Sequence, residues 1–532
     1  MKKIISILLA VAMVFTLAAC SGKNAATPNT EATTGNETTG TETSNQASAS
    51  SSPIVVNVCE TGNAVVSLAF YEYSLHTEWQ YAECCYDSLL HASYDGSFEP
   101  EICTSYEIAD DGLSAVLHLA DGVYFQDGSV LNADDVVCTL NYLAENKDTL
   151  AMISTVWGNL VGAEKIDDLT VQINMDKKYH AFEAALGYTF IFSDEDFAEY
   201  GDQMWAKGVI NGSGPWIYKE WIDGQRITFT RNDNYWKGVH TNVDELNIWY
   251  TSEANTIVSS LLSGEIDAVA KVNNDLLPMI EGNADFNLEK YDVDSLNYLQ
   301  FKCGSGDAFE DINMRKAVMH AINLEAFLNF YGGGSVLPCA ATPGNDGFVD
   351  LGGYAYDPEL AKEYLAKTNY DGRALSLASW TSKSNECTAI ASDLAAIGIN
   401  VTLNLCDSAA FSALRKEGNY DMFYGGVATW DGDLMTQYMV PRIADDCHNH
   451  GYQDDYIDEL LHNADQETDR EKRKAMLEEV MTWMYNNYGP ICGTVQECAT
   501  RAVRKGLDGI NYMAGGIMFY RDVNVDTSVW SK

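Results

Sequence analysis

Basic residues are scarce in this chain of 532 residues. Lys and Arg total 33 against 77 Asp and Glu, so the formal net charge is −44. A protein that neutralises nucleic-acid phosphates needs clustered cations, and so does one that senses anionic lipid surfaces. The charge balance therefore argues against a nucleic-acid partner and against electrostatic membrane binding. It favours solubility and the attraction of cationic ligands.

Motifs of several enzyme classes are also missing. The chain has no G-x-x-x-x-G-K-[ST] phosphate loop, no H-E-x-x-H zinc motif and no G-x-S-x-G nucleophile elbow. Only nine His are present, and none stands in a recognisable triad context. A carboxylate pair for glycoside chemistry stays open, because 77 acids make chance pairs inevitable. We predict that the protein is not an enzyme and carries no cofactor.

Long apolar runs are absent after the first twenty residues, so no later segment is predicted to span a bilayer. The chain starts with the basic stretch Met1-Lys2-Lys3, and an apolar run follows over residues 4–17. Leu17-Ala18-Ala19-Cys20 resembles the lipobox of bacterial lipoproteins. That resemblance implies a signal peptide over residues 1–19 and diacylation of Cys20, which gives stable anchoring. An ordinary secretory signal with a chance Cys is the alternative.

Residues 21–53 contain no aromatic and almost no aliphatic side chain, and they are rich in Ser, Thr, Ala, Asn and Gly. Such a segment cannot bury enough apolar surface to offset its chain entropy, so we expect it to be disordered. Behind a lipidated Cys20, residues 20–53 would be a tether that holds the folded part away from the membrane.

Cysteine is plentiful, with 13 residues, but none forms a C-x-x-C pair. The twelve that remain without Cys20 are spread through segments typical of a protein core, so we expect free buried thiols. The run from Asp445 to His450 holds a Cys and two His that could bind a soft metal. Its spacing is not that of a structural zinc site, and we predict no metal site.

Short apolar strands alternate with amphipathic helices from Ile54 onward. Residues 115–119 alternate between apolar and polar side chains, which predicts a half-buried strand. Asn132 is typical of a helix N-cap, and the two Asp in the first turn favour a helix to about Asn146. Strands interleaved with helices indicate α/β lobes. The other predicted strands are 54–58, 171–175, 226–230, 245–250 and 400–405, and the other helices are 254–263, 315–331, 357–365, 389–397 and 469–485.

A series of motifs between residues 60 and 500 resembles the extracellular solute-binding proteins of family 5, the peptide and nickel binders of ABC importers. One is Leu117–Gly128, and the most specific is Asn211-Gly212-Ser213-Gly214-Pro215-Trp216. Arg231–Trp236, Phe309–Ala317 and Gly418–Asp421 follow in the order of that family. Single pieces are weak, but their shared order is specific.

The resemblance implies an α/β protein with a two-lobed periplasmic-binding-protein-like fold (type II, cluster C) and an extra domain inserted in the first lobe. We place lobe 1 at 54–83, 189–292 and 495–532, the inserted domain at 84–188, and lobe 2 at 293–494. Closure of the lobes would enclose the ligand. The implied function is that of a monomeric, lipid-anchored protein on the extracytoplasmic face of a bacterial membrane. It would capture peptides and deliver them to ABC permease and ATPase subunits.

In peptide-binding members of that family, an Asp after a Gly-Trp pair holds the α-ammonium of the ligand, since a buried cation needs a charged partner. The corresponding stretch here is Gly425–Asp433, and Val427 replaces the Trp. An ungapped match places Trp430 at the anchoring position, whereas Asp431 and Asp433 fit only with shifts. We predict Asp431 as the anchor and Trp430 as a stacking wall. The alternative is that both acids lie in a solvated loop.

This departure leaves other ligands open. An oligosaccharide would stack on Trp430, and a metal chelate could use His448 or His450. A surface sensor or adhesin that reuses the fold is a further alternative, because a fold does not determine a function.

Overall fold

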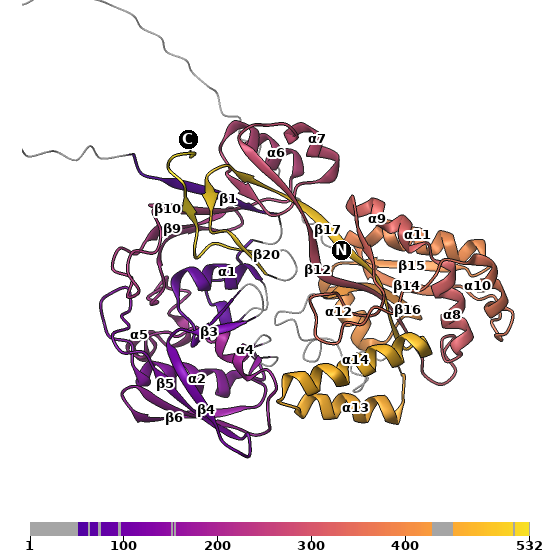
Figure 1. The fold of residues 1–532 in the computed structure, drawn as a ribbon, viewed down its shortest axis with the longest axis horizontal. Coiled ribbons are helices and arrows are strands. Elements are labelled where there is room, and N and C mark those ends of the chain that lie inside the picture. Colours follow the sequence, from indigo (N-terminus) through magenta and orange to yellow (C-terminus); the bar gives the residue numbers. More distant parts are fainter. Residues whose placement is uncertain are drawn as a thin grey trace, which may run out of the picture. The chain divides into compact units, whose positions relative to one another are not determined.

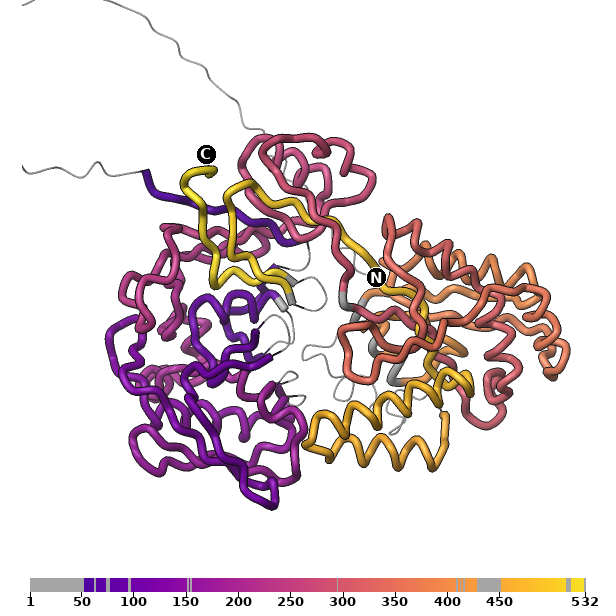
Figure 2. The backbone as a smooth tube through the Cα atoms, in the orientation of Figure 1, coloured from indigo at the N-terminus to yellow at the C-terminus, as the bar shows by residue number. Residues whose placement is uncertain are grey.

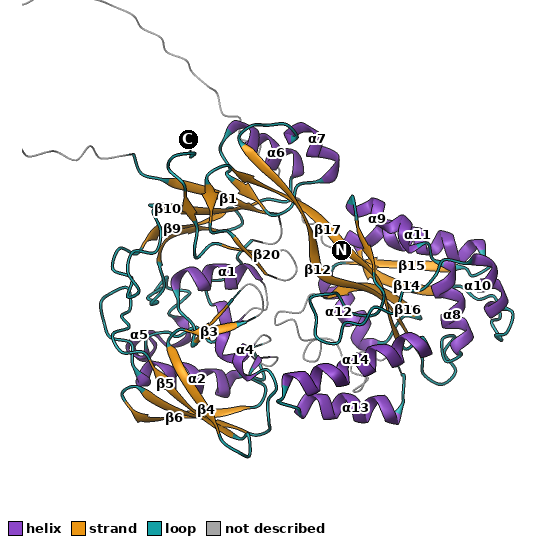
Figure 3. Cartoon of the chain, viewed as in Figure 1, coloured by secondary structure: helices purple, strands orange, loops and turns teal. Residues whose placement is uncertain are grey.

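The computed structural model describes residues 52–530, except 62–63, 73–75, 94–96, 151–152, 154–155, 428–450 and 514–516. Helices and strands alternate along this part of the chain, which confirms the predicted α/β class (Figure 3). Among the helices of the described residues, none has the length and apolar character needed to cross a membrane.

Eleven strands of the described residues form the main sheet (Figure 1). The eleventh strand, β13 (Gly334–Val336), pairs with β17 off the main path. The other ten lie in the order β15 (Val401–Cys406), β14 (Leu375–Trp380), β16 (Met422–Val427), β12 (Phe286–Phe301), β17 (Ile491–Arg504), β11 (Ala268–Val269), β1 (Val55–Glu60), β10 (Glu245–Tyr250), β9 (Arg226–Arg231) and β8 (Trp216–Ile222).

Parallel pairing divides this sheet into two half-sheets. In the first half-sheet, β1 runs parallel to β10 and β11, and in the second, β14 runs parallel to β15 and β16. The long antiparallel strands β12 and β17 join them, and they run side by side in Figure 1. Residues 286–292 of β12 pair with residues 498–504 of β17, the part of β17 that also pairs with β11. Residues 296–301 of β12 pair with β16. The pairing of β12 with β17 shifts register between Asp292 and Leu296.

A second, antiparallel sheet lies within residues 103–175. Its order is β4 (Cys103–Ile108), β5 (Ser114–Leu119), β7 (Thr170–Met175) and β6 (Leu160–Asp167). The remaining strands form short pairs, namely β2 (Leu90–Ala92) with β3 (Phe98–Pro100), β18 (Leu507–Asp508) with β21 (Asn524–Val525), and β19 (Asn511–Met513) with β20 (Ile517–Phe519).

Helices flank both sheets, and α11 packs on β14 and β15 (Figure 3). The helices are α1 (His76–Cys85), α2 (Ala133–Asn146), α4 (Phe182–Gly187), α5 (Asp194–Tyr200), α6 (Ala254–Ser263), α7 (Leu277–Ile280), α8 (Ile312–Ala321), α9 (Leu324–Tyr331), α10 (Pro358–Leu365), α11 (Ser384–Ala396), α12 (Ser408–Glu417), α13 (Asp455–Gln466) and α14 (Arg470–Asn487).

Local signals decide where several helices begin and end. The prediction for α2 is confirmed, because Asn132 accepts a hydrogen bond from the Asp134 N–H at 2.8 Å and Asp135 closes a capping box. The prediction of one helix over 315–331 is wrong. Asn323 interrupts it by capping α9, where its side chain accepts from the Ala326 N–H at 3.3 Å. The chain therefore forms α8 and α9 instead.

The largest apolar core surrounds β1, α1 and the antiparallel sheet, and separate clusters cover the second half-sheet. The C-terminal segment returns to the first half-sheet, as the yellow tube beside the indigo tube shows in Figure 2. There the Trp216 Nε1–H donates to the Arg521 carbonyl at 2.9 Å. The domain boundaries proposed from the sequence stay predictions.

Candidate functional site

Ligands of open α/β sheets bind at the carboxyl ends of parallel strands. In the first half-sheet these ends are Glu60 of β1 and Tyr250 of β10. In the second they are Trp380 of β14 and Val427 of β16. The candidate site therefore comprises the polar side chains at these ends and those of β12 and β17 between them.

The ligand contacts predicted from the sequence come directly after β16. Trp430, Asp431 and Asp433 lie outside the described residues, as do the run 445–450 and Cys20. Their roles stay predictions.

A buried carboxylate ends β1. Glu60 accepts hydrogen bonds from Gln80 Nε2 at 2.6 Å and from the Tyr520 hydroxyl. Gln80 Nε2 also donates to the Met518 carbonyl at 2.7 Å, which ties α1 to β20. Burial raises the pKa of Glu60 to about 7, although the hydrogen bonds from Tyr520 and Gln80 oppose the shift. Within the described residues, no basic side chain forms an ion pair with Glu60.

Tyr250 completes this group, which we call the Glu60 cluster (Glu60, Gln80, Tyr250 and Tyr520). Glu60 and Tyr250 are register partners on parallel strands, so their side chains leave the same face of the sheet. Burial and the nearby Glu60 raise the pKa of the Tyr250 hydroxyl well above its usual value. Tyr250 is 7% exposed and Gln80 2% exposed. Among the described residues, neither the Tyr250 hydroxyl nor Gln80 Oε1 has a hydrogen-bond partner.

Lysines from both half-sheets share one carboxylate on β17. Lys383, the last residue of the 3-10 turn after β14, forms an ion pair with Glu497 and donates to Asn297 Oδ1 at 2.9 Å. Lys271, just after β11, lies 3.8 Å from the other Glu497 oxygen. Burial alone would raise the pKa of Glu497, but Lys383 and Lys271 outweigh it and lower the pKa. We call these residues (Lys271, Lys383 and Glu497) the Glu497 bridge.

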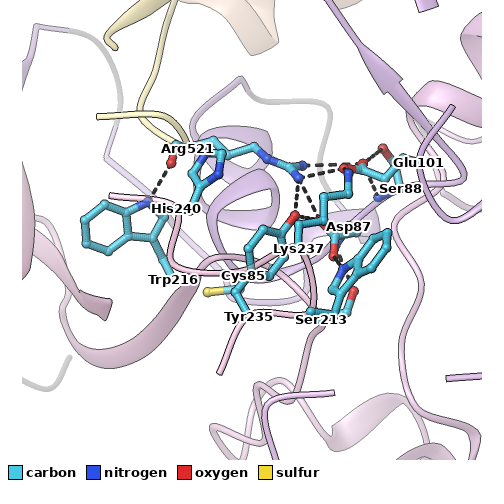
Figure 4. Close-up of polar contacts among 12 residues, drawn as sticks. Cys85, Asp87, Ser88, Glu101, Ser213, Trp216, Tyr235, Lys237, His240 and Arg521 are labelled. Atoms are coloured by element: carbon cyan, nitrogen blue, oxygen red, sulfur yellow. Dashed lines mark hydrogen bonds and ion pairs between the residues drawn. The ribbon is translucent and has the colours of Figure 1, made fainter. Parts of the chain in front are cut away.

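A third buried group, drawn in Figure 4, is the Arg521 cluster (Asp87, Glu101, Lys237 and Arg521). Arg521 Nη2 lies 2.8 Å from Asp87 Oδ1 and 2.6 Å from Glu101 Oε1. Lys237 Nζ lies 2.7 Å from Glu101 Oε1. Burial alone would raise the pKa of Glu101, but Arg521 and Lys237 hold it at about 2. Two acids therefore meet two bases, and the cluster fastens the C-terminal segment to the core.

Two cavities lie away from the strand ends that define the site. One of about 420 Å³ is lined by Asp307, Asp311 and Arg373, close to the amino end of β14. The other, of about 290 Å³, is lined by His180, Ala181, Glu183 and Ala184 together with Arg470 and Arg473 of α14. Neither includes a member of the Glu60 cluster or of the Glu497 bridge.

Metal ligands do not gather in the described part of the chain, which holds no group of three or more His, Cys, Asp or Glu suited to a metal ion. The eleven cysteines described are free thiols, and nine of them are buried. Burial raises the pKa of Cys303 and of Cys492 to about 12, which keeps both thiols protonated and unreactive.

Sequence reasoning missed both polar groups at the strand ends. An acid that closes an apolar strand is a signal that could have singled out Glu60. No local pattern points to the Glu497 bridge, because Lys383 and Glu497 are 114 residues apart in sequence.

Comparisons with known proteins agree with this architecture. Residues 97–442 match the family described as bacterial extracellular solute-binding proteins, family 5 Middle. The chain belongs to this family, and its members are solute-binding proteins of ABC transporters. Heme-binding protein A of Haemophilus influenzae is 27% identical over 433 residues, which are 73% of this chain and 77% of that protein. The glutathione-binding protein of Pectobacterium atrosepticum is 24% identical, over 88% of this chain and 94% of that protein.

Solved structures share the fold at low sequence identity. The Brucella suis protein NikA, in complex with Fe(III)-EDTA, has a TM-score of 0.78 at 22% identity, and the match covers 89% of this chain and all of NikA. A Pseudoalteromonas dipeptide-binding protein in complex with Met-Leu has a TM-score of 0.73 at 21% identity, with 89% of this chain and all of that chain covered. The predicted two-lobed periplasmic-binding-protein fold is thereby confirmed.

Proposed function

We propose that this protein is the capture component of an ABC importer that takes up peptides. It holds its ligand between two lobes and delivers it to permease and ATPase subunits. The observation that carries the proposal is the pair of parallel half-sheets joined by β12 and β17, in a chain that belongs to family 5. In such an arrangement, the carboxyl ends of the parallel strands from both half-sheets can contact the same ligand. Two joining strands allow a hinge motion that closes the lobes around it.

The proposal includes a lipid anchor. Residues 1–19 direct export, Cys20 carries the acyl chains, and residues 20–53 tether a monomeric binding unit to the extracytoplasmic face of the membrane. An intact mass that contains two acyl chains on Cys20 supports the anchor. Release of the Cys20→Ala variant into the medium is the matching expectation, and membrane retention of that variant contradicts it.

Peptides are the favoured ligand class for a physical reason. Glu60 is a buried acid without a basic partner among the described residues, and an ammonium-bearing ligand would supply one. The relatives named for peptides and glutathione point the same way. The proteins named for heme and for an iron chelate make heme or a metal chelate the alternative ligand class.

Native mass spectrometry tests the ligand class. The full-length chain is extracted from membranes in mild detergent and weighed under gentle and under denaturing conditions. An extra mass in the range of a short peptide, lost on denaturation, is expected. A heme, chelate or sugar mass overturns the peptide assignment. If no mass is retained, binding of a defined peptide pool is measured instead, and a chain that binds no peptide contradicts the proposal.

The anchor predicted from the sequence is tested separately. Asp431→Asn is expected to weaken peptide binding more than tenfold, because it removes the partner of the α-ammonium. Asp433→Asn is the matched control and should change the dissociation constant less than twofold. Equal effects of the two substitutions, or none, refute the assignment of Asp431.

A further inference from the structure

Glu60 lies where a ligand of this fold would be held. It is the last residue of β1, and β1 pairs in parallel with β10 on one side and β11 on the other. The carboxyl end of a strand between two parallel neighbours is the favoured ligand position of an α/β sheet. The Arg521 cluster is equally buried, but its acids are matched by bases.

Nothing in the described residues neutralises the charge of Glu60. Its hydrogen-bond partners, Gln80 and Tyr520, are neutral donors. Arg501 of β17 stacks on the Tyr512 ring, 3.5 Å from its centroid, but forms an ion pair with Glu289 at 2.7 Å. A buried carboxylate without a basic partner is costly, so its presence needs a compensating role.

Two unpartnered polar atoms accompany this carboxylate. The amide of Gln80 is held in the cluster by its bond to Glu60, and its Oε1 accepts no hydrogen bond from any described residue. The hydroxyl of Tyr250, the register partner of Glu60, also has no hydrogen-bond partner within the part of the chain that the structure describes. A carboxylate, an amide oxygen and a hydroxyl oxygen are all acceptors, and an ammonium offers three donors. A metal ion is disfavoured, since the described residues gather no set of metal ligands here.

We propose that the Glu60 cluster is a subsite for a cationic group of the ligand, an ammonium or guanidinium that pairs with Glu60 and donates to Gln80 and Tyr250. This subsite rests on the proposed function and is distinct from the predicted anchor at Asp431. It specifies a ligand with a basic group, such as a lysine-containing peptide.

Proton release accompanies binding at such a subsite. Without ligand, part of Glu60 is protonated at neutral pH, because burial raises its pKa to about 7. A bound cation favours the carboxylate and expels that proton, so binding at neutral pH should release a fraction of a proton per ligand. The titratable groups that face Glu60 are phenols and a thiol whose own pKa values are raised, namely Cys59, Tyr250, Tyr291, Tyr512 and Tyr520.

Matched peptides test the subsite on the full-length chain. The probes are the tripeptides Ala-Lys-Ala and Ala-norleucine-Ala, each with a free and an acetylated amino terminus, and binding is measured by titration calorimetry. Wild-type protein should prefer a cationic probe over its neutral counterpart at least tenfold. Glu60→Gln should remove that preference and change the affinity for the neutral probe less than twofold. Asp135→Asn is the control and should keep the preference for the cationic probe. Asp135 is also buried with a pKa of about 7, but it belongs to α2 and not to the Glu60 cluster.

Each outcome separates the subsite from the proposed function. If both the wild type and Glu60→Gln bind peptides and prefer the cationic probe equally, the subsite is overturned but the proposed function is not. The same conclusion follows if the wild type binds peptides without preferring the cationic probe. Failure of the wild type to bind any peptide overturns the proposed function and the subsite with it. Calorimetry in two buffers of different ionisation enthalpy should show proton release by the wild type and none by Glu60→Gln.

A second variant tests the subsite independently, in case Glu60→Gln does not fold. Tyr520→Phe removes a hydrogen bond that favours the ionised Glu60. The pH midpoint for binding the Ala-Lys-Ala probe should therefore move upward, with affinity recovered at higher pH. An unchanged midpoint overturns the role of Glu60.

Discussion

The Arg521 cluster and the Glu60 cluster bury carboxylates in the same core, yet they differ in charge balance. In the first, Asp87 and Glu101 meet Arg521 and Lys237. In the second, Glu60 accepts hydrogen bonds from the neutral side chains of Gln80 and Tyr520, and no basic partner for it lies in the described part of the chain. Arg521 and Lys237 hold the pKa of Glu101 at about 2, whereas burial raises that of Glu60 to about 7. The pKa of Asp87 is raised, because burial and the neighbouring Glu101 outweigh the effect of Arg521.

This difference separates a structural role from a binding role. Acids matched by bases fasten distant segments of the chain together, as Asp87 and Glu101 do through Arg521. An acid without a base destabilises the empty protein when it ionises, and a cationic ligand relieves that cost. The Glu497 bridge is intermediate, since its two lysines are partly exposed.

The largest expected effect is the loss of Arg521. Arg521→Met leaves two buried carboxylates with only Lys237 nearby, so the free energy of unfolding should fall by about 3–5 kcal/mol. Denaturant titration measures it. Arg373→Met is the control, because Arg373 also forms two hydrogen bonds to a carboxylate, Asp421, but its side chain is 45% exposed. That pair should contribute less than about 1 kcal/mol. Similar losses for both variants would break the comparison.

A Glu→Gln substitution should change the free energy of unfolding in opposite directions in the two clusters. Glu60 has a raised pKa, so its ionisation destabilises the fold above pH 7 and costs nothing below pH 4.5. Glu60→Gln should therefore raise the free energy of unfolding at pH 8 by up to about 3 kcal/mol and leave it unchanged at pH 4. Unfolding curves of the ligand-free protein at both pH values measure the change. A Glu60→Gln variant less stable than the wild type at pH 8 contradicts this prediction.

Glu101 has a lowered pKa, so its charge stabilises the fold above pH 4.5, and that stability is lost as the pH falls toward 2. Glu101→Gln should lower the free energy of unfolding at pH 8 by up to about 3 kcal/mol. Equal signs for the two Glu→Gln variants would show that charge balance does not distinguish the clusters.

A smaller effect is expected at the Glu497 bridge. Glu497→Gln removes the shared partner of Lys271 and Lys383, but both lysines reach solvent, so we expect a loss of about 1–2 kcal/mol. The 60% exposed Glu289, paired with Arg501, provides the control, and Glu289→Gln should cost less than about 0.5 kcal/mol. Thermal unfolding at neutral pH measures both losses. Equal losses would show that the Glu497 bridge contributes no more to stability than an exposed ion pair.

Elements with local signals could be predicted from the sequence. Asn132 and Asp135 form the expected capping box, and the strand at 115–119 falls within β5. The break between α8 and α9 was missed, because apolar residues continue in helical spacing through Asn323 and conceal its capping role. The anchor at Asp431 stays a prediction, since residues 428–450 are outside the described part of the chain.

The sequence by itself determined the α/β class, those helices and strands with clear local signals, such as α2 and β5, and the membership of family 5 that its ordered motifs indicated. Only the tertiary structure decided which buried acids are balanced. Arg521 lies 434 residues from Asp87, and Tyr520 lies 460 residues from Glu60. Caps and periodicity depend on neighbours within a turn or two of the chain. The charge state of a buried carboxylate depends instead on groups that folding brings beside it from the other end of the sequence.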